Sequence, residues 1–229
     1  MIGIIGAMAI EIDEIKSCIE NQEIKTISGC DFVKGVLNGR EVVAAQCGIG
    51  KVNAAVCAQS MILTYQPELI INVGVGGSLI SALRYGDMAI ADKVVQHDVD
   101  TTPLGDPIGL VSTINKVYFE CDAQTVACIK GVVDEMDGIN GMVGTIASGD
   151  QFVNDSALKE RIVKNFDAIS CEMEGGAISQ ACLLGGVKCA VIRSISDNAD
   201  DDSNSDYGQF MRLAAAHSAE VLRRVIGRL

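Results

Sequence analysis

Two glutamates, Glu172 and Glu174, stand two residues apart in the stretch AISCEMEGGAI, between an apolar run and two glycines. Carboxylates this close repel each other, so the pKa of one should rise unless a ligand satisfies both. If the strand continued through them, both would share one face and Met173 would point the other way. A carboxylate only accepts hydrogen bonds, which suits a vicinal diol whose two hydroxyls both donate. The pair therefore indicates a sugar-binding site.

Two further acids follow apolar runs that read as strands: Glu11 after IGIIGA, and Asp197 after VIRSIS. In open α/β sheets ligands bind beyond the carboxyl ends of the strands, so we expect all four acids at one edge. A single acid at such a place is often a helix cap or a solvated strand end, but four together favour a common site. Sugar-binding acids suggest cleavage of a glycosidic bond, whose oxocarbenium-like transition state is flanked by an acid and a base.

The acids can be given distinct tasks if the leaving group is a purine. Asp197, beside Ser196, could protonate a ring nitrogen of the base, and Glu11 could take a proton from water. A phosphorolytic enzyme would instead need basic residues near the anomeric carbon, and no Arg or Lys precedes Lys16 in the chain. This pattern favours hydrolysis over phosphorolysis.

The glycine-rich segments CGIGK (47–51) and VGVGG (73–77) are weaker signals. Neither completes a phosphate-binding or a dinucleotide-binding motif. They are typical of tight strand exits, or of a backbone that approaches a flat ligand closely.

The elements that must position these residues alternate along the chain. Continuous apolar runs alternate with segments of helical spacing, which predicts a parallel or mixed sheet covered by helices on both faces. No linker or repeat interrupts the 229 residues, so we expect one α/β domain over residues 1–229. The expected strands cover residues 2–7, 24–28, 30–38, 40–48, 67–77, 86–98, 141–150, 168–172 and 188–197. The expected helices cover residues 11–20, 51–65, 114–136, 156–165, 175–185 and 206–228.

Composition excludes several classes of partner. The net charge of −12, without a basic cluster, argues against nucleic acid and against anionic membrane surfaces. No apolar stretch reaches the 18 residues or so of a membrane span. The nine cysteines are odd in number, form no C-x-x-C pair and lie mostly in apolar runs, so we expect a reduced, cytoplasmic protein.

We expect no metal. Only two histidines are present, and the acidic loop 197–206 fails the calcium-loop pattern. Counted from Asp200, its sixth position is Ser205 rather than Gly, and its twelfth is Met211 rather than Glu.

Six segments, in order across almost the whole chain, together resemble the bacterial 5′-methylthioadenosine/S-adenosylhomocysteine nucleosidases. These segments are IGIIGAMAIEID, CGIGKVNAA, INVGVGG, SGDQFVN, CEMEGGAI and RSISDNAD. The resemblance implies a nucleoside phosphorylase-like three-layer α/β sandwich around a twisted mixed sheet, acting as a homodimer. It implies hydrolysis of adenosyl thioethers to adenine and a thio-ribose in methionine salvage, with no metal or organic cofactor.

The resemblance also implies roles for individual residues. Glu11 is similar to the acid that activates water, and Asp197 to the acid that protonates the purine. Glu174 resembles the residue that grips the ribose hydroxyls, with Met173 packed beside the sugar and Glu172 in support. The other implied substrate-binding residues are Phe152 and Val153 at the adenine, Met8, Ile49 and Tyr207 at the 5′-thioether, Arg193 and Ser196 flanking the sugar and the acid, and Val75 and Gly76 of INVGVGG.

The sequence departs from the family pattern in three places. Val75 stands where many members carry Ser or Thr, which removes a hydroxyl near the ribose. Ala9 and Ile10 replace acidic residues that often precede the glutamate. The loop 101–112 lacks the aromatic residues that commonly reach the 5′ pocket of a neighbouring subunit, which leaves the preferred 5′ substituent open.

Three alternative functions stay open on the same residues. Two are enzymes of the same fold, a purine nucleoside phosphorylase and an aminodeoxyfutalosine hydrolase. The third is a nucleoside-binding protein without catalysis. The presence of Glu11, Glu174 and Asp197 argues against it, because a site that has lost its activity would tolerate the loss of these acids. For His97, in QHDVD, we expect a structural or interface role rather than a place in the site.

Overall fold

The computed structural model describes residues 1–200 and 203–229; Asp201 and Asp202 of the acidic loop lie outside the described residues. Its strands are β1 (Ile2–Gly6), β2 (Glu20–Ile27), β3 (Cys30–Leu37), β4 (Arg40–Gln46), β5 (Leu69–Ser78), β6 (Met88–Gln96), β7 (Tyr118–Glu120), β8 (Gly141–Ser148), β9 (Ala168–Glu172) and β10 (Lys188–Asp197). Its helices are α1 (Ala9–Ser17), α2 (Lys51–Tyr65), α3 (Ala123–Asp134), α4 (Ser156–Phe166), α5 (Gly175–Gly185) and α6 (Ser203–Ile226), with one 3-10 turn, η1 (Thr102–Leu104).

All ten of these strands join one mixed sheet. Strand β5 lies between β1 and β10 and is parallel to both, and all ten of its residues are buried. Strands β10, β6, β8, β9 and β5 pair in succession, and the β10–β5 pairing closes them into a ring. Strands β4, β3 and β2 extend the sheet beyond β1. The mixed sheet agrees with the prediction, and the division into a single domain over residues 1–229 stays a prediction.

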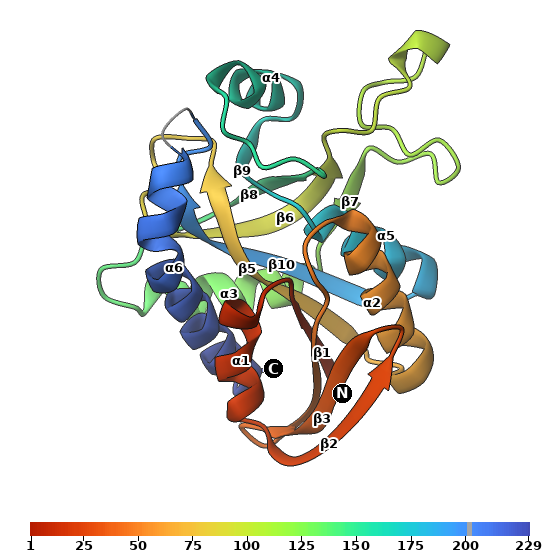
Figure 1. The fold of residues 1–229 in the computed structure, drawn as a ribbon, viewed down its shortest axis with the longest axis vertical. Coiled ribbons are helices and arrows are strands. Elements are labelled where there is room, and N and C mark those ends of the chain that lie inside the picture. Colours follow the sequence, from red (N-terminus) through yellow and green to blue (C-terminus); the bar gives the residue numbers. More distant parts are fainter. Residues whose placement is uncertain (201–202) are drawn as a thin grey trace.

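Helices cover both faces of the sheet, which confirms the expected layered α/β architecture. Helices α2 and α5 pack together on one face, while α1 and α3 pack against the long helix α6 on the other (Figure 1). Strands buried on both faces need apolar side chains throughout, which explains the continuous apolar runs of β1 and β5.

The expected helix over residues 114–136 is wrong in its first part. Residues Tyr118–Glu120 form β7, which runs antiparallel to β6 with Phe119 opposite Val94. Helix α3 starts only after Asp122, whose carboxylate accepts a hydrogen bond of 3.0 Å from the N–H of Thr125. Pairing with β6 and the cap at Asp122 thus override the apolar spacing that suggested a continuous helix.

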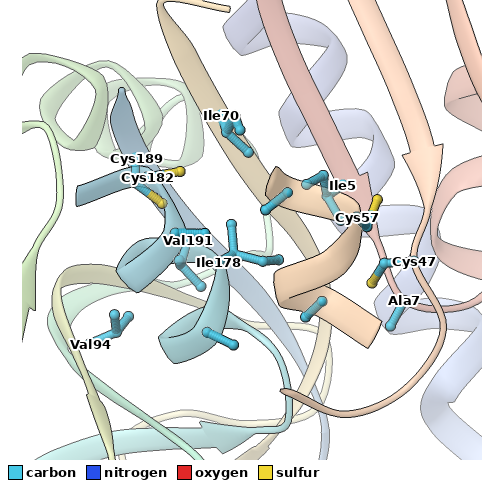
Figure 2. Packing of buried hydrophobic residues seen from close by; sticks show 14 of the residues in the cluster. Ile5, Ala7, Cys47, Cys57, Ile70, Val94, Ile178, Cys182, Cys189 and Val191 are labelled. Atoms are coloured by element: carbon cyan, nitrogen blue, oxygen red, sulfur yellow. The ribbon is translucent and has the colours of Figure 1, made fainter. Parts of the chain in front are cut away.

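The cysteines serve the core as small apolar residues. All nine are free thiols, and six of them are buried. Figure 2 shows Cys47 and Cys57 near Ile5, and Cys182 and Cys189 near Val191, in the core between the sheet and helices α2 and α5. This packing agrees with the burial expected from the position of most cysteines in apolar runs.

The described residues lack the features of two other classes of protein. Within residues 1–200 and 203–229, no helix combines the length and apolar character that crossing a membrane requires. The same part of the chain holds no group of three His, Cys, Asp or Glu side chains arranged to hold a metal ion.

Candidate active site

A cavity of about 370 Å³ opens where the carboxyl ends of β1, β5, β9 and β10 meet. Its volume lies within the range typical of small-molecule sites. Its lining residues are Ala7, Met8, Glu11, Ile49, Val75, Gly76, Gly77, Gln151, Phe152, Val153, Cys171, Glu172, Met173, Glu174, Ser196, Asp197 and Tyr207.

The structure therefore brings together every predicted site residue except Arg193. Ala7, Gly77, Gln151 and Cys171 also line the cavity and were not predicted. Each is a chain neighbour of a predicted residue, so proximity in sequence was the only signal that could have found them. His97 is buried and lies outside the lining, as expected for a structural residue.

Glu11 sits in the first turn of α1, where three backbone N–H groups fix its carboxylate. Oε2 accepts hydrogen bonds of 2.8 Å from both Ala7 and Met8, and Oε1 accepts one of 2.9 Å from Val75. Burial raises the pKa of Glu11, and it outweighs the lowering effects of Arg193 and of these backbone hydrogen bonds. A carboxyl group with a raised pKa and a fixed position suits the task of a general base.

The approach of Glu11 to β5 requires a glycine at position 74. A Cβ atom on Gly74 would lie 2.5 Å from Oε1 of Glu11, closer than carbon and oxygen can approach. Any side chain at this position would displace the carboxylate, so the first glycine of GVGG has a steric purpose.

Glu172 and Glu174 do not share one strand face, because the chain leaves the sheet between them, in agreement with the strand expected over residues 168–172. Strand β9 ends at Glu172, and Glu174 is the residue that caps α5. The chain turns here because Oε2 of Glu172 accepts hydrogen bonds from the N–H groups of Glu174, at 2.9 Å, and Gly175, at 2.7 Å. Both glutamates and Met173 still line the cavity, because the turn carries all three along its wall.

Arg193 lies behind the glutamates rather than in the cavity wall. Its guanidinium, 1% exposed, pairs with Glu172 and lies 3.7 Å from Oε2 of Glu174. The same group donates a hydrogen bond of 2.5 Å to Oδ1 of Asn72. Arg193 does not line the cavity, because these partners hold the side chain inside the core. Arg193 thus supplies the positive charge that compensates the buried carboxylates.

The buried glutamates of the site share the positive charge of Arg193, which affects their protonation states. Glu11, Glu172 and Glu174 are all buried, and within residues 1–200 and 203–229 Arg193 is the cation that ion pairs place among them. Burial and the adjacent charge of Glu172 raise the pKa of Glu174 to about 7, despite Arg193 and a hydrogen bond of 2.9 Å from the Gly50 N–H. Glu174 can therefore change protonation state near neutral pH.

Asp197 is the last residue of β10. Its Oδ2 accepts a hydrogen bond of 2.9 Å from the Ser196 hydroxyl, and its Oδ1 accepts one of 3.0 Å from the Ala199 N–H. Ala199 supplies this N–H from a left-handed backbone conformation, with φ 52°. The turn thereby points the carboxyl group of Asp197 into the cavity, where it can give a proton to a bound base.

Aromatic and apolar side chains form the remaining walls. Phe152, 40% exposed, meets Tyr207 edge to face with the ring centroids 5.5 Å apart. The Tyr207 hydroxyl lies 3.2 Å from the sulfur of Met8, and Val75 packs in the same apolar cluster. A flat aromatic base and an apolar thioether both suit these walls.

Comparison with known proteins identifies the family. Residues 1–227 match the model of the phosphorylase superfamily. A curated 5′-methylthioadenosine/S-adenosylhomocysteine nucleosidase of Halalkalibacterium halodurans is 40% identical over 229 residues, covering 100% of this chain and 98% of that protein. The chain therefore belongs to the phosphorylase superfamily, and within it to the family of 5′-methylthioadenosine/S-adenosylhomocysteine nucleosidases.

Solved structures agree with this placement. The nucleosidase of Neisseria meningitidis in complex with methylthio-immucillin-A is 33% identical, with a TM-score of 0.96, covering 100% of this chain and 99% of that one. A futalosine hydrolase of Helicobacter pylori is 37% identical, with a TM-score of 0.94, covering 100% of this chain and 97% of that one. The nucleoside phosphorylase-like fold expected from the sequence is thus confirmed.

Proposed function

We propose that this protein hydrolyses the N-glycosidic bond of 5′-methylthioadenosine and S-adenosylhomocysteine, releasing adenine and the 5-thio-substituted ribose. The observation that carries the proposal is one cavity holding Glu11, Glu174 and Asp197, three buried acids with separate hydrogen-bond environments. Membership of the nucleosidase family supports the same reaction.

In the proposed reaction each acid has a separate step. Asp197 donates a proton to a ring nitrogen of adenine, so the bond from the base to the anomeric carbon breaks and its electron pair leaves with the base. Glu11 accepts a proton from water, whose oxygen bonds to the anomeric carbon. Glu174 accepts hydrogen bonds from the ribose hydroxyls, while Glu172, held by Arg193, fixes the turn that carries it. Phe152 stacks against the base.

The decisive experiment follows adenine release from 5′-methylthioadenosine in phosphate-free buffer, and then with phosphate added. We expect release without phosphate, together with a free reducing sugar. Release only with phosphate would identify a phosphorylase and remove the role of Glu11 as the base for water.

A second candidate is hydrolysis of aminodeoxyfutalosine. The similarity to the futalosine hydrolase of Helicobacter pylori, at 37% identity, favours testing it. Both reactions need the same acids, so the 5′ wall decides between them. Comparing kcat/KM for the thioether and futalosine-type substrates separates the two, and we expect the thioether to be preferred.

We further propose a homodimer. Large apolar side chains stand exposed along α2, α5 and the turns beside them, among them Val52 at 74%, Leu63 at 71% and Leu184 at 68%. Exposed apolar side chains on neighbouring helices are a feature of protein interfaces, and the family resemblance makes a second copy of this chain the partner. Light scattering should give twice the chain mass, and Leu184→Glu should shift it towards the monomer; a monomeric wild type would refute the proposal.

We place the enzyme in the cytoplasm and in methionine salvage. Its nine free thiols suit a reducing compartment. The substrates proposed above are the adenosyl thioethers that such a salvage reaction consumes.

A further inference from the structure

A ring of three polar residues lies at the rim of the cavity, outside its lining. The N–H of Lys51 donates a hydrogen bond of 2.7 Å to Oδ1 of Asp150. The N–H of Asp150 donates one of 2.9 Å to Oδ2 of Asp98. The ammonium of Lys51 closes the ring through an ion pair of 2.6 Å with Oδ1 of Asp98. Each of the three residues is thus bonded to both of the others.

The ring joins three segments that are far apart in the sequence. Lys51 begins α2, Asp98 follows β6, and Asp150 follows β8. Gly50 permits the close approach of the first and third segments, because its φ is 96° and a Cβ there would lie 3.0 Å from Oδ1 of Asp150. A residue with a side chain would be strained at this φ and crowded by the carboxylate.

Two parts of the site depend on the segments that the ring connects. The N–H of Gly50, next to Lys51, donates to Oε1 of Glu174 at 2.9 Å, which orients the carboxylate proposed to hold the ribose. Phe152 and Val153, which line the base side of the cavity, follow Asp150 by two and three residues. The ring therefore lies between the sugar-binding carboxylate and the base-binding segment.

The ion pair is suited to hold this arrangement at working pH. The side chains of Lys51 and Asp98 are 17% and 18% exposed, so solvent screens them less than a surface pair. Burial alone would raise the pKa of Asp98, but the hydrogen bonds from Lys51 and from the Asp150 N–H outweigh it and lower the pKa. Asp98 thus stays ionised around neutral pH, and the ring stays closed.

We propose that Lys51, Asp98 and Asp150 form a positioning clasp that couples the sugar-binding carboxylate to the base-binding wall. The clasp touches no reacting atom and acts through Glu174 and Phe152. The identity of its two subsites rests on the function proposed above. A ligand that spans both subsites needs them at a fixed separation, whereas a ligand that occupies one does not.

The test compares two ligands on Lys51→Met, which removes the ammonium and keeps the backbone N–H. Calorimetry measures the Kd of methylthio-immucillin-A, which spans both subsites, and of adenine, which occupies one. We expect the Kd of the analogue to rise about 10-fold and that of adenine less than about 2-fold. Lys51→Arg should keep most of the affinity for the analogue. If Lys51→Met misfolds, Asp98→Asn provides the same test and should weaken the analogue to a similar degree.

The matched control is Lys116→Met, which breaks an exposed ion pair of 3.3 Å with Glu120 away from the cavity. It should change neither Kd. Equal weakening of both ligands by Lys51→Met, or no change in either, would overturn the clasp.

Hydrogen exchange of the free protein tests the clasp even if the analogue does not bind. Lys51→Met should speed exchange of the Gly50 and Asp150 amides, while Lys116→Met should not. Unchanged exchange at both amides would also overturn the proposal. The hydrolysis assay on the wild type decides the proposed function separately.

Discussion

The inner wall of the cavity and its rim are held in different ways. The inner wall consists of Glu11, Glu172, Glu174 and Asp197, none more than 7% exposed. At the rim, Ile49 is 52% exposed and Phe152 is 40% exposed. Strand ends, the first turns of helices and one buried guanidinium fix the wall, whereas the rim is carried by turns between elements.

The difference in burial between wall and rim corresponds to a difference in task between proton transfer and ligand entry. Groups that transfer protons need fixed positions and shifted pKa values, which burial supplies. Groups that admit a ligand must stay accessible, so they gain less from packing and depend on links such as the clasp. We therefore expect substitutions of the two proton-transferring acids in the wall, Glu11 and Asp197, to affect rates strongly, and substitutions at the rim to affect affinity modestly.

The largest effect is expected for Asp197→Asn. The amide cannot deliver a proton, so kcat should fall about 10²–10⁴-fold. The fold should tolerate the change, because the Ser196 hydroxyl can rotate to accept from the new NH₂ group. Steady-state kinetics and a thermal midpoint check both points; a near wild-type rate would show that Asp197 is not the acid.

Glu11→Gln should lose hydrolysis in the same range, about 10²–10⁴-fold, while binding methylthio-immucillin-A nearly as well as the wild type. It should be less stable than Asp197→Asn. All three N–H groups at its carboxylate are backbone donors that cannot reverse, so one must face the new amide nitrogen. Loss of analogue binding together with activity would move Glu11 from catalysis to binding.

Glu174→Ala should weaken ribonucleosides far more than analogues without sugar hydroxyls. Hydrogen bonds to a charged group contribute about 1.5–3 kcal/mol, so the affinity for the nucleoside should fall about 10–100-fold. Paired Kd measurements on a nucleoside and its dideoxy form provide the comparison. Equal losses for both would refute a diol clamp at Glu174.

The pH dependence of nucleoside binding should follow the ionisation of Glu174. Glu174 has a folded pKa of about 7, above its ordinary value of 4.5, so it is largely protonated at pH 6 and ionised at pH 8. Nucleoside affinity should rise across this interval by up to about 10-fold, because only the carboxylate accepts from both hydroxyls. Glu174→Gln should flatten the profile.

The contribution of Glu174 to the free energy of unfolding should fall as pH rises, whereas its contribution to nucleoside affinity should increase. The folded protein binds the Glu174 proton more tightly than the unfolded chain does, so the stability contributed falls as pH rises from about 4.5 to about 7. Denaturant titrations of the wild type and Glu174→Gln across this window isolate that contribution. A difference between the two proteins that grows towards low pH would contradict the raised pKa.

The smallest effect is expected at the rim. Phe152→Leu keeps apolar bulk and loses the stacking ring, which is worth about 1 kcal/mol, so the adenine Kd should rise about 5-fold with little change in kcat. A kcat loss as large as that of Asp197→Asn would show that the rim takes part in the chemistry and would remove the distinction drawn above.

Local pattern was enough to predict much of this arrangement. Apolar runs end at Glu172 and Asp197 and shortly before Glu11, which places these acids at or just beyond strand ends, and the topology of the sheet then gathers them. The hidden position of Arg193 could not be predicted, because it depends on Asn72, which lies 121 residues earlier in the chain. The end of the strand at Glu172 was predicted, but the two hydrogen bonds that the Glu172 carboxylate accepts from the following backbone N–H groups were not. Strand β7 was missed because its pairing with β6 is likewise long-range.

The rate at which each buried cysteine is alkylated should report how often the surrounding core opens. Burial raises the pKa values of Cys47, Cys57 and Cys171, so the reactive thiolate is scarce while the structure is closed. Each sulfur becomes modifiable only when its part of the fold separates, and Cys171 lies in the cavity wall itself. Mass spectrometry after timed alkylation would therefore rank regions by how often they open, with a bound nucleoside delaying Cys171 most.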